Sequence, residues 1–108
     1  MKKEECGELN MLERYLKEHN IRYERIDQDR IFDREKGIAQ NERHQINVLD
    51  EEGNRLWDAI CHPGSYGYER GLLEIYGSIV DEARVGDTVE GWLTAQDVIC
   101  LIEGRWPE

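Results

Sequence analysis

The stretch Arg55–Val80, RLWDAICHPGSYGYERGLLEIYGSIV, organises the predicted fold. Its first part, Leu56–Cys61, is an apolar run interrupted only by Asp58, which predicts a buried strand. The loop that follows, His62–Gly67, contains a proline and two glycines, which favour a sharp change of direction. Beyond the loop, apolar residues recur at three- and four-residue spacing, which predicts a helix over 68–80; they are Leu72, Ile75, Tyr76, Ile79 and Val80.

A second strand is expected immediately upstream of this stretch. Gln45–Leu49 alternates, with Ile46 and Val48 on one side of the chain. The segment Asp50–Asn54 has turn chemistry, and Gly53 suits the left-handed position of a hairpin turn. We therefore predict an antiparallel hairpin over residues 45–61 at the centre of a small sheet.

The remaining elements complete an α+β fold class. Apolar periodicity predicts helices over 9–19 and 94–103, the second opened by Thr94 as N-cap with Asp97 three residues later. Short strands are expected near 21–26 and 88–93. The prediction is a single domain over 1–108, with residues 1–8 frayed and two helices on one face of three or four antiparallel strands. Residues 27–43 lack a pattern, so we expect an irregular arm or a short helix over 29–36.

Charge restricts the classes of partner. The 24 acids and 14 bases give a net charge of −10, which disfavours nucleic acid and anionic membranes as direct ligands. It is compatible with a basic protein partner, and it also suits a small soluble protein with no charged ligand. Residues 1–63 hold fifteen acids and eleven bases, so most of the imbalance falls in the last 45 residues. The candidate partner-binding residues there are Tyr66, Tyr68, Glu69, Glu74, Asp81, Glu82 and Asp87.

The sequence also predicts the cellular compartment of the protein and the redox state of its cysteines. No apolar run approaches the roughly 20 residues of a membrane span, and the first residues are not followed by the apolar segment of a signal peptide. We therefore expect a soluble, cytoplasmic protein. Three widely spaced cysteines, Cys6, Cys61 and Cys100, indicate reduced thiols and no disulfide framework.

Catalytic and metal sites find little support in the pattern. Cys61 and His62 are adjacent, and adjacent residues of a strand project to opposite faces, so they do not form a nucleophile–base pair without a bend at Pro63. A metal site built from Cys61, His62, Cys100 and either His44 or His19 lacks the short spacings of zinc motifs. The expectation is no enzyme activity, no metal and no cofactor.

The loop around Gly64–Gly67 supports a second hypothesis. Backbone N–H groups at a helix N-terminus attract anions, and Tyr66 or Tyr68 would offer a stacking wall for a small molecule or nucleotide. The spacing of the glycines matches neither known phosphate-binding fingerprint, which favours a purely structural corner.

The aromatic residues are expected to divide between core and surface. Trp57 and Trp92 are expected in the core, Tyr66 and Tyr68 at the surface, and Trp106 has no obvious burial partner.

Three strings carry a resemblance to a known family: WDAICHPGSYGY at residues 57–68, GLLEIYG at residues 71–77 and VEGWLTA at residues 89–95. Over residues 45–102 the chain resembles small open reading frames of phages and mobile elements. That family has no assigned biochemistry, so no catalytic residue is carried over. The resemblance implies an accessory role, such as inhibition of host defence by an anti-CRISPR type of protein.

These observations combine into one leading hypothesis. The chain would be a mobile-element inhibitor that binds a basic, nucleic-acid-handling host protein such as a CRISPR effector nuclease. Carboxylates at Glu69, Glu74, Asp81, Glu82 and Asp87 would replace phosphates, with Tyr66 and Tyr68 as apolar anchors. The mixed-charge segment 27–43 is the alternative contact.

Overall fold

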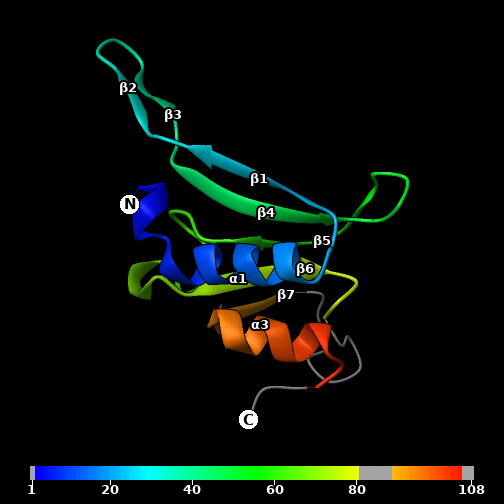
Figure 1. The fold of residues 1–108 in the computed structure, drawn as a ribbon. Helices are drawn as coiled ribbons and strands as arrows, with labels where there is room; N and C mark the ends of the chain where they lie inside the picture. The colour runs from blue at the N-terminus through cyan, green and yellow to red at the C-terminus, as the bar shows by residue number, and fades with distance from the viewer. Residues whose placement is uncertain (1, 81–88, 106–108) are drawn as a thin grey trace.

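The computed structural model describes residues 2–80 and 89–105 of the chain (Figure 1). The predicted partner-binding residues Asp81, Glu82 and Asp87, and Trp106, lie outside these residues. The elements in chain order are η1 (Lys3–Glu5), α1 (Gly7–Glu18), β1 (Tyr23–Gln28), β2 (Ile31–Asp33), β3 (Gly37–Gln40), β4 (Arg43–Leu49), β5 (Arg55–Ile60), η2 (Tyr68–Arg70), β6 (Leu73–Gly77), β7 (Val89–Leu93) and α3 (Ala95–Ile102).

The fold is α+β, as predicted, with a five-stranded antiparallel sheet in the order β1-β4-β5-β6-β7. The predicted hairpin is its centre: β4 pairs with β5, with Gln45 opposite Ile60 and Val48 opposite Trp57. The turn between them is held by Asp50, whose Oδ1 accepts the N–H groups of Glu52 and Asn54. The sheet has one or two strands more than expected because residues 73–77 form β6 instead of a helix.

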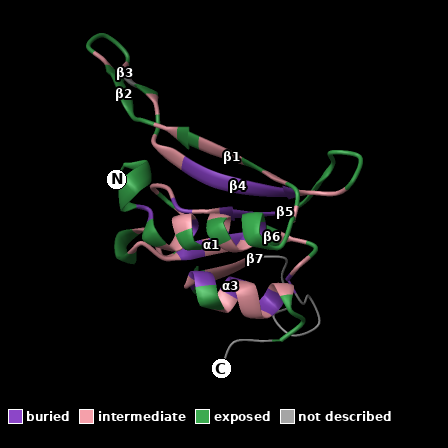
Figure 2. Ribbon diagram, in the orientation of Figure 1, coloured by how far each residue is buried: buried purple, intermediate pink, exposed green. Residues whose placement is uncertain are grey.

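The core lies between the sheet and the two helices α1 and α3, which contact each other along one face of the sheet (Figures 1 and 2). Three leucines of α1 at helical spacing, Leu9, Leu12 and Leu16, are fully buried. The predicted helices over 9–19 and 94–103 are confirmed within two residues at each end. At the start of α3, Thr94 Oγ1 accepts from Asp97 N–H and Asp97 Oδ2 accepts from Thr94 N–H, at 3.1 and 2.9 Å.

The predicted helix over 68–80 is wrong. Residues 68–70 form only a 3-10 turn between two left-handed glycines, and β6 follows. Leu73 and Ile75 are buried while Tyr76 is exposed, so the period is two rather than 3.6. Gly77 at φ +121° ends the strand, and a Cβ there would lie 2.8 Å from the Cα of Trp57. This close approach excludes the interior of a helix at this point.

Residues 27–43, predicted to be irregular or helical, instead extend two strands of the sheet outward. β1 and β4 continue into β2 and β3, which form a separate two-stranded antiparallel sheet that projects from the body (Figure 1). Side-chain hydrogen bonds hold its base: Gln28 Nε2 donates to the carbonyl of Asn41 and Gln40 Nε2 to that of Asp29, each at 2.8 Å.

Among the described residues, no helix is long and apolar enough to cross a membrane.

Candidate functional site: an aromatic pair on the helix-free face of the sheet

One face of the sheet is not covered by α1 or α3. Alternation along the strands directs Ile46, Ala59 and Ile75 toward the helices, where all three are fully buried. The intervening residues therefore point to the opposite side, which we call the helix-free face. Adjacent pairs in the register form one row across it: Glu24, Asn47, Asp58 and Tyr76.

The centre of the helix-free face is a connected polar network. Gln45, Asn47 and Asp58 are each less than one-tenth exposed although neither α1 nor α3 covers them. Gln45 Nε2 donates to Asn47 Oδ1 at 2.6 Å and to Asp58 Oδ2 at 3.0 Å, and Asn47 Nδ2 donates to Glu24 Oε1 at 2.9 Å. Burial raises the pKa of the Asp58 carboxyl, and the nearby Arg55 only partly opposes this. The network is largely satisfied internally, so it supports the face more than it offers free groups.

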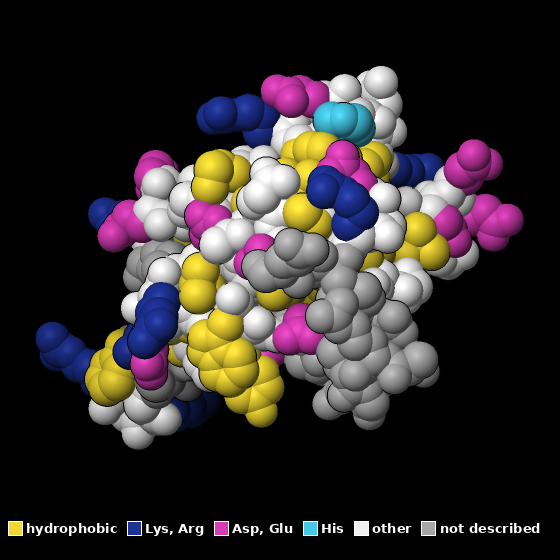
Figure 3. Space-filling view, turned by 90° about the horizontal axis from the view of Figure 1, so that it is seen from below, with side chains coloured by type: hydrophobic (Ala, Val, Ile, Leu, Met, Phe, Trp, Pro, Cys, Tyr) yellow, Lys and Arg dark blue, Asp and Glu magenta, His cyan; other side chains and the backbone are white. Residues whose placement is uncertain are grey.

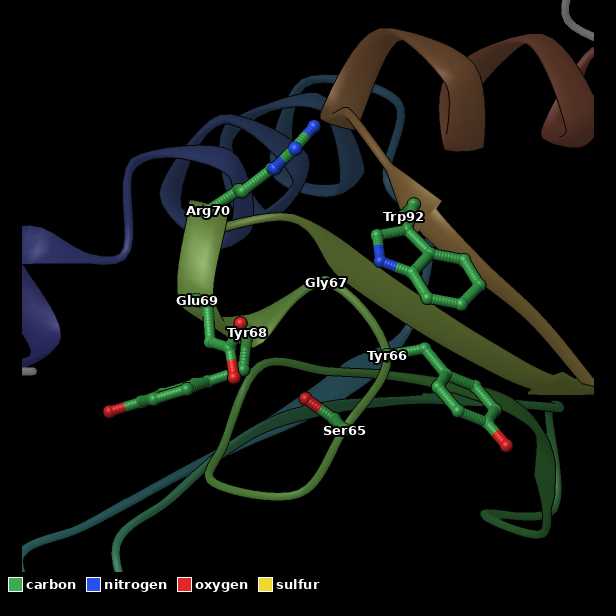
Figure 4. Close-up of a pocket in the computed structure, with 7 residues that line it drawn as sticks. All are labelled: Ser65, Tyr66, Gly67, Tyr68, Glu69, Arg70 and Trp92. Atoms are coloured by element: carbon green, nitrogen blue, oxygen red, sulfur yellow. The ribbon is translucent and has the colours of Figure 1, made fainter.

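Beside this network stands an exposed aromatic pair. The rings of Tyr66 and Trp92 stack with centroids 5.0 Å apart and planes 24° apart (Figure 4). Tyr66 is 54% and Trp92 59% exposed. Tyr76, 49% exposed, lies on the same face of β6. In the view from below, hydrophobic side chains reach the surface between scattered charged groups (Figure 3).

The backbone around the pair is unusual. Trp92 adopts φ +54°, a left-handed conformation that is costly for a bulky residue, next to an irregularity in the β6–β7 pairing. Its N–H donates to the carbonyl of Tyr66 at 3.3 Å. A Cβ on Gly91 would lie 2.5 Å from the Cβ of Tyr66, so glycine is required for Tyr66 to lie against β7. The loop and the edge strand are therefore built to hold these two rings together.

Polar groups orient the loop that carries Tyr66. Glu74 Oε1 on β6 accepts the Tyr66 N–H at 3.1 Å, and Ser65 Oγ donates to the carbonyl of His62 at 2.7 Å.

Beside Trp92 lies a hollow of about 200 Å³, with Glu69 and Arg70 on its wall (Figure 4). The full lining is Ser65, Tyr66, Gly67, Tyr68, Glu69, Arg70 and Trp92.

Two aromatic predictions need correction. Trp92, expected in the core, is exposed, because the left-handed turn of its backbone directs the indole outward; Trp57 is buried as expected. Tyr68, expected at the surface, is half-buried, and its hydroxyl donates to Glu42 Oε2 at 2.8 Å. Burial and this carboxylate raise the pKa of Tyr68 to about 12. Of the predicted contact residues in the described chain, Tyr66, Glu69 and Glu74 lie at or beside the pair, and Tyr68 lines the same hollow but is half-buried, with its hydroxyl bonded to Glu42.

Cys61 and His62, the adjacent residues considered as a nucleophile and base, differ in their surroundings. Cys61 is a core residue, 1% exposed, and burial raises the pKa of its thiol. Burial lowers the pKa of His62, whose Nδ1 has no hydrogen-bond partner among the described atoms. Within residues 2–80 and 89–105 there is no group of three or more His, Cys, Asp and Glu side chains that could hold a metal ion.

Sequence reasoning did not identify the buried charge network around His44. This side chain is 1% exposed, with Nδ1 2.8 Å from Asp27 Oδ1 and Nε2 3.4 Å from Glu42 Oε2. Arg25 then bridges Asp27 and Glu13, at 2.9 and 3.2 Å. The register pair Asp27–His44 could have been found only by extending the predicted strand 21–26 by two residues at its C-terminal end and the predicted strand 45–49 by two residues at its N-terminal end. The network joins α1, β1 and β4 and has a structural role.

Comparison with family models, curated proteins and solved structures found no match for the chain.

Proposed function

We propose that this protein acts by binding another protein through the helix-free face, with the Tyr66–Trp92 pair as its anchor. The observation that carries the proposal is that two large aromatic side chains are exposed together in a strained, preorganised arrangement. Tyr and Trp are the side chains that most often dominate interface energetics. Backbone strain of about 1–3 kcal/mol at such a residue is typical of functional positions. The proposal assigns no reaction to the protein.

The net charge of −10 supports a basic partner. Nucleic-acid-handling host proteins, including CRISPR effector nucleases, present basic grooves, and the phage-like resemblance of residues 45–102 favours that class. In this mechanism long-range attraction accelerates association, and the aromatic pair then supplies the short-range apolar contact. The protein would thus act as an inhibitor that occupies a surface its partner uses for nucleic acid.

The roles of the carboxylates differ in this proposal from simple phosphate replacement. Glu74 accepts the Tyr66 N–H, so it positions the anchor as well as contributing charge. Glu69 is exposed at the rim of the hollow and is free to steer a cationic surface. Reversal of Glu69 to lysine should lower the association rate, and reversal of Glu74 should also disturb the Tyr66 loop.

The experiment measures binding to, and inhibition of, a panel of CRISPR effector nucleases, with Trp92→Ala and Gly91→Ala as test variants. Trp92→Ala removes the anchor, and Gly91→Ala displaces Tyr66 from it through the 2.5 Å clash. Each should weaken binding by about 2 kcal/mol, roughly thirtyfold. Phe32→Ala, which removes an aromatic side chain 70% exposed and remote from β7, is the matched control. If the variants bind like the wild type, the anchor is misassigned; if no effector is bound, the proposed partner class is wrong.

A second candidate function is favoured by the hollow beside Trp92. The indole could stack on the base of a nucleotide while Arg70 meets its phosphate. The hollow of about 200 Å³ is smaller than the roughly 300–1,000 Å³ of most ligand pockets, which makes this the weaker candidate. The helix N-terminus originally expected at this loop is a three-residue 3-10 turn. A rise in melting temperature with nucleotides, lost in Arg70→Ala, would favour it over protein binding.

A further inference from the structure

The hairpin β2–β3, with its flanking residues 29–40, is a second surface that the proposed function does not use; we call it the arm. The arm is a built structure: Asp33 Oδ1 accepts the N–H groups of Glu35 and Lys36 at 2.8 and 3.0 Å, and Gly37 completes the turn at φ +84°. The bonds from Gln28 and Gln40 hold its base. It therefore presents its side chains in a defined arrangement.

The arm exposes its apolar residues instead of burying them. Phe32, the single phenylalanine of the chain, is 70% exposed, and Ile31 is 52% exposed. They are consecutive residues of β2, so their side chains leave the strand on opposite sides, and β2 itself projects away from the core (Figure 1). Because more than half of the surface of each residue is exposed, these two residues contribute little to the packing of the monomer. They suit a contact with another protein surface.

The charge of the arm differs from that of the body. Residues 29–40 contain three acids, Asp29, Asp33 and Glu35, and three bases, Arg30, Arg34 and Lys36, so the arm is neutral in a chain of net charge −10. An interface between two identical copies related by a twofold axis must be self-complementary. An exposed apolar side chain flanked by equal numbers of acids and bases satisfies this requirement. Contact through projecting arms also keeps the two acidic bodies apart, which limits their mutual repulsion.

We propose that the arm is a homodimerisation surface, in which Phe32, the more exposed of the two apolar residues, packs against Phe32 of a second copy. Acids and bases at the tip then pair across the twofold axis. The contact is small, below the roughly 1,200 Å² of a standard interface, so the dimer is weak and forms with rising concentration. This surface is separate from the aromatic pair at β7, so the dimer leaves the proposed partner-binding face free.

The first test is sedimentation equilibrium of the full chain between about 10 µM and 1 mM, the range in which small interfaces associate. The wild type should show a monomer–dimer equilibrium that persists at 0.5 M salt, because its centre is apolar. Phe32→Ser should weaken dimerisation at least about tenfold. Tyr76→Ser, which removes an exposed aromatic of the helix-free face, is the matched control and should leave the equilibrium unchanged. A wild type that is monomeric throughout, or a Phe32→Ser variant that dimerises normally, overturns the proposal.

A charge-swap pair distinguishes arm-to-arm contact from docking of the arm on the acidic body. One variant carries Arg34→Glu with Lys36→Glu, and the other Asp29→Lys with Glu35→Lys; all four side chains are exposed. In low salt, each variant alone should be monomeric because like charges meet, and an equimolar mixture should form heterodimers. If the arm docked on the body, the basic variant alone would dimerise more strongly than the wild type, and the proposal would be wrong.

Discussion

The imidazole Nδ1 of His44 lies 2.8 Å from Oδ1 of Asp27, its register partner on β1, and the histidine is almost fully buried. Burial alone would raise the pKa of the Asp27 carboxyl, but hydrogen bonds from His44 and Arg25 outweigh it and hold the pKa below its ordinary value. Because the pKa of Asp27 is lower in the folded chain than in the unfolded chain, its ionised carboxylate stabilises the fold at pH values above the unfolded pKa of about 4. This contribution is lost as the pH falls through the folded value.

Asp27→Asn should therefore lower the free energy of unfolding at pH 7 by about 1–3 kcal/mol, since it removes a charge-assisted bond to a buried group. The difference from the wild type should shrink as the pH falls from 5 toward 3, about the unfolded pKa. Melting temperatures from circular dichroism across this range measure it. Asp29→Asn, at an exposed position on the arm, is the control. A constant difference at every pH would contradict the assigned role of Asp27.

Asp58 should behave in the opposite way. Burial raises its pKa, so folding disfavours its ionised form, and its contribution to stability improves as the pH falls through the folded pKa. Asp58→Asn should leave the free energy of unfolding at pH 7 unchanged or higher, because the amide oxygen still accepts from Gln45 Nε2. Gln45→Ala should cost about 1–3 kcal/mol, because Asn47 Oδ1 loses this donor and Asp58 Oδ2 keeps only the longer 3.4 Å bond from Arg55. Urea denaturation of both variants provides the comparison; a loss above about 1 kcal/mol in Asp58→Asn would refute the expectation.

Trp92 offers a test of strain held at the proposed binding surface. Asparagine tolerates the left-handed conformation much better than tryptophan does. Trp92→Asn should therefore be as stable as the wild type or more stable by up to about 1 kcal/mol, although it removes a large side chain. Its partner binding should be lost. A marked fall in melting temperature would mean that the indole serves the fold rather than recognition.

The three cysteines should differ in reactivity. Burial, and then the nearby Cys61, raise the pKa of the Cys6 thiol to about 11, and burial raises that of Cys61. Cys100 is only partly buried. In the native protein at pH 8, an aromatic disulfide reagent should label Cys100 rapidly and the other two only at the rate of unfolding. Cys100→Ser should abolish the fast phase; rapid labelling of Cys6 or Cys61 would show that the core opens at that end.

The hairpin over 45–61 and the two helices could be predicted because their apolar residues have a single consistent period and local capping or turn chemistry. The structure of residues 68–80 could not be predicted in this way. Their apolar residues fit both the spacing of a helix and the alternation of a strand, in which Leu73 and Ile75 lie on the same side. Only the sheet decides between them: β6 pairs with β5, and Gly77 must lie against Trp57. The arm had no readable pattern because its apolar residues are exposed.

The proposed binding site could likewise be predicted only in part from the sequence. Exposure of Tyr66 could be predicted from its position in a glycine loop, but its partner Trp92 is brought to it by an irregular edge strand. Tyr68 was expected at the surface with Tyr66 and is half-buried, because its hydroxyl donates to Glu42. Side-chain direction at these positions depends on register and on positive φ angles, which neighbouring strands impose.

The amino-acid sequence by itself determined the α+β class, the central hairpin, the two amphipathic helices and the excess of acidic charge, since each depends on composition or on periodicity within one segment. The tertiary structure alone decided that 73–77 is a strand, that His44 lies between two carboxylates and that Tyr66 stacks on Trp92. These features depend on contacts between segments distant in the chain, where burial and backbone pairing outweigh local preference.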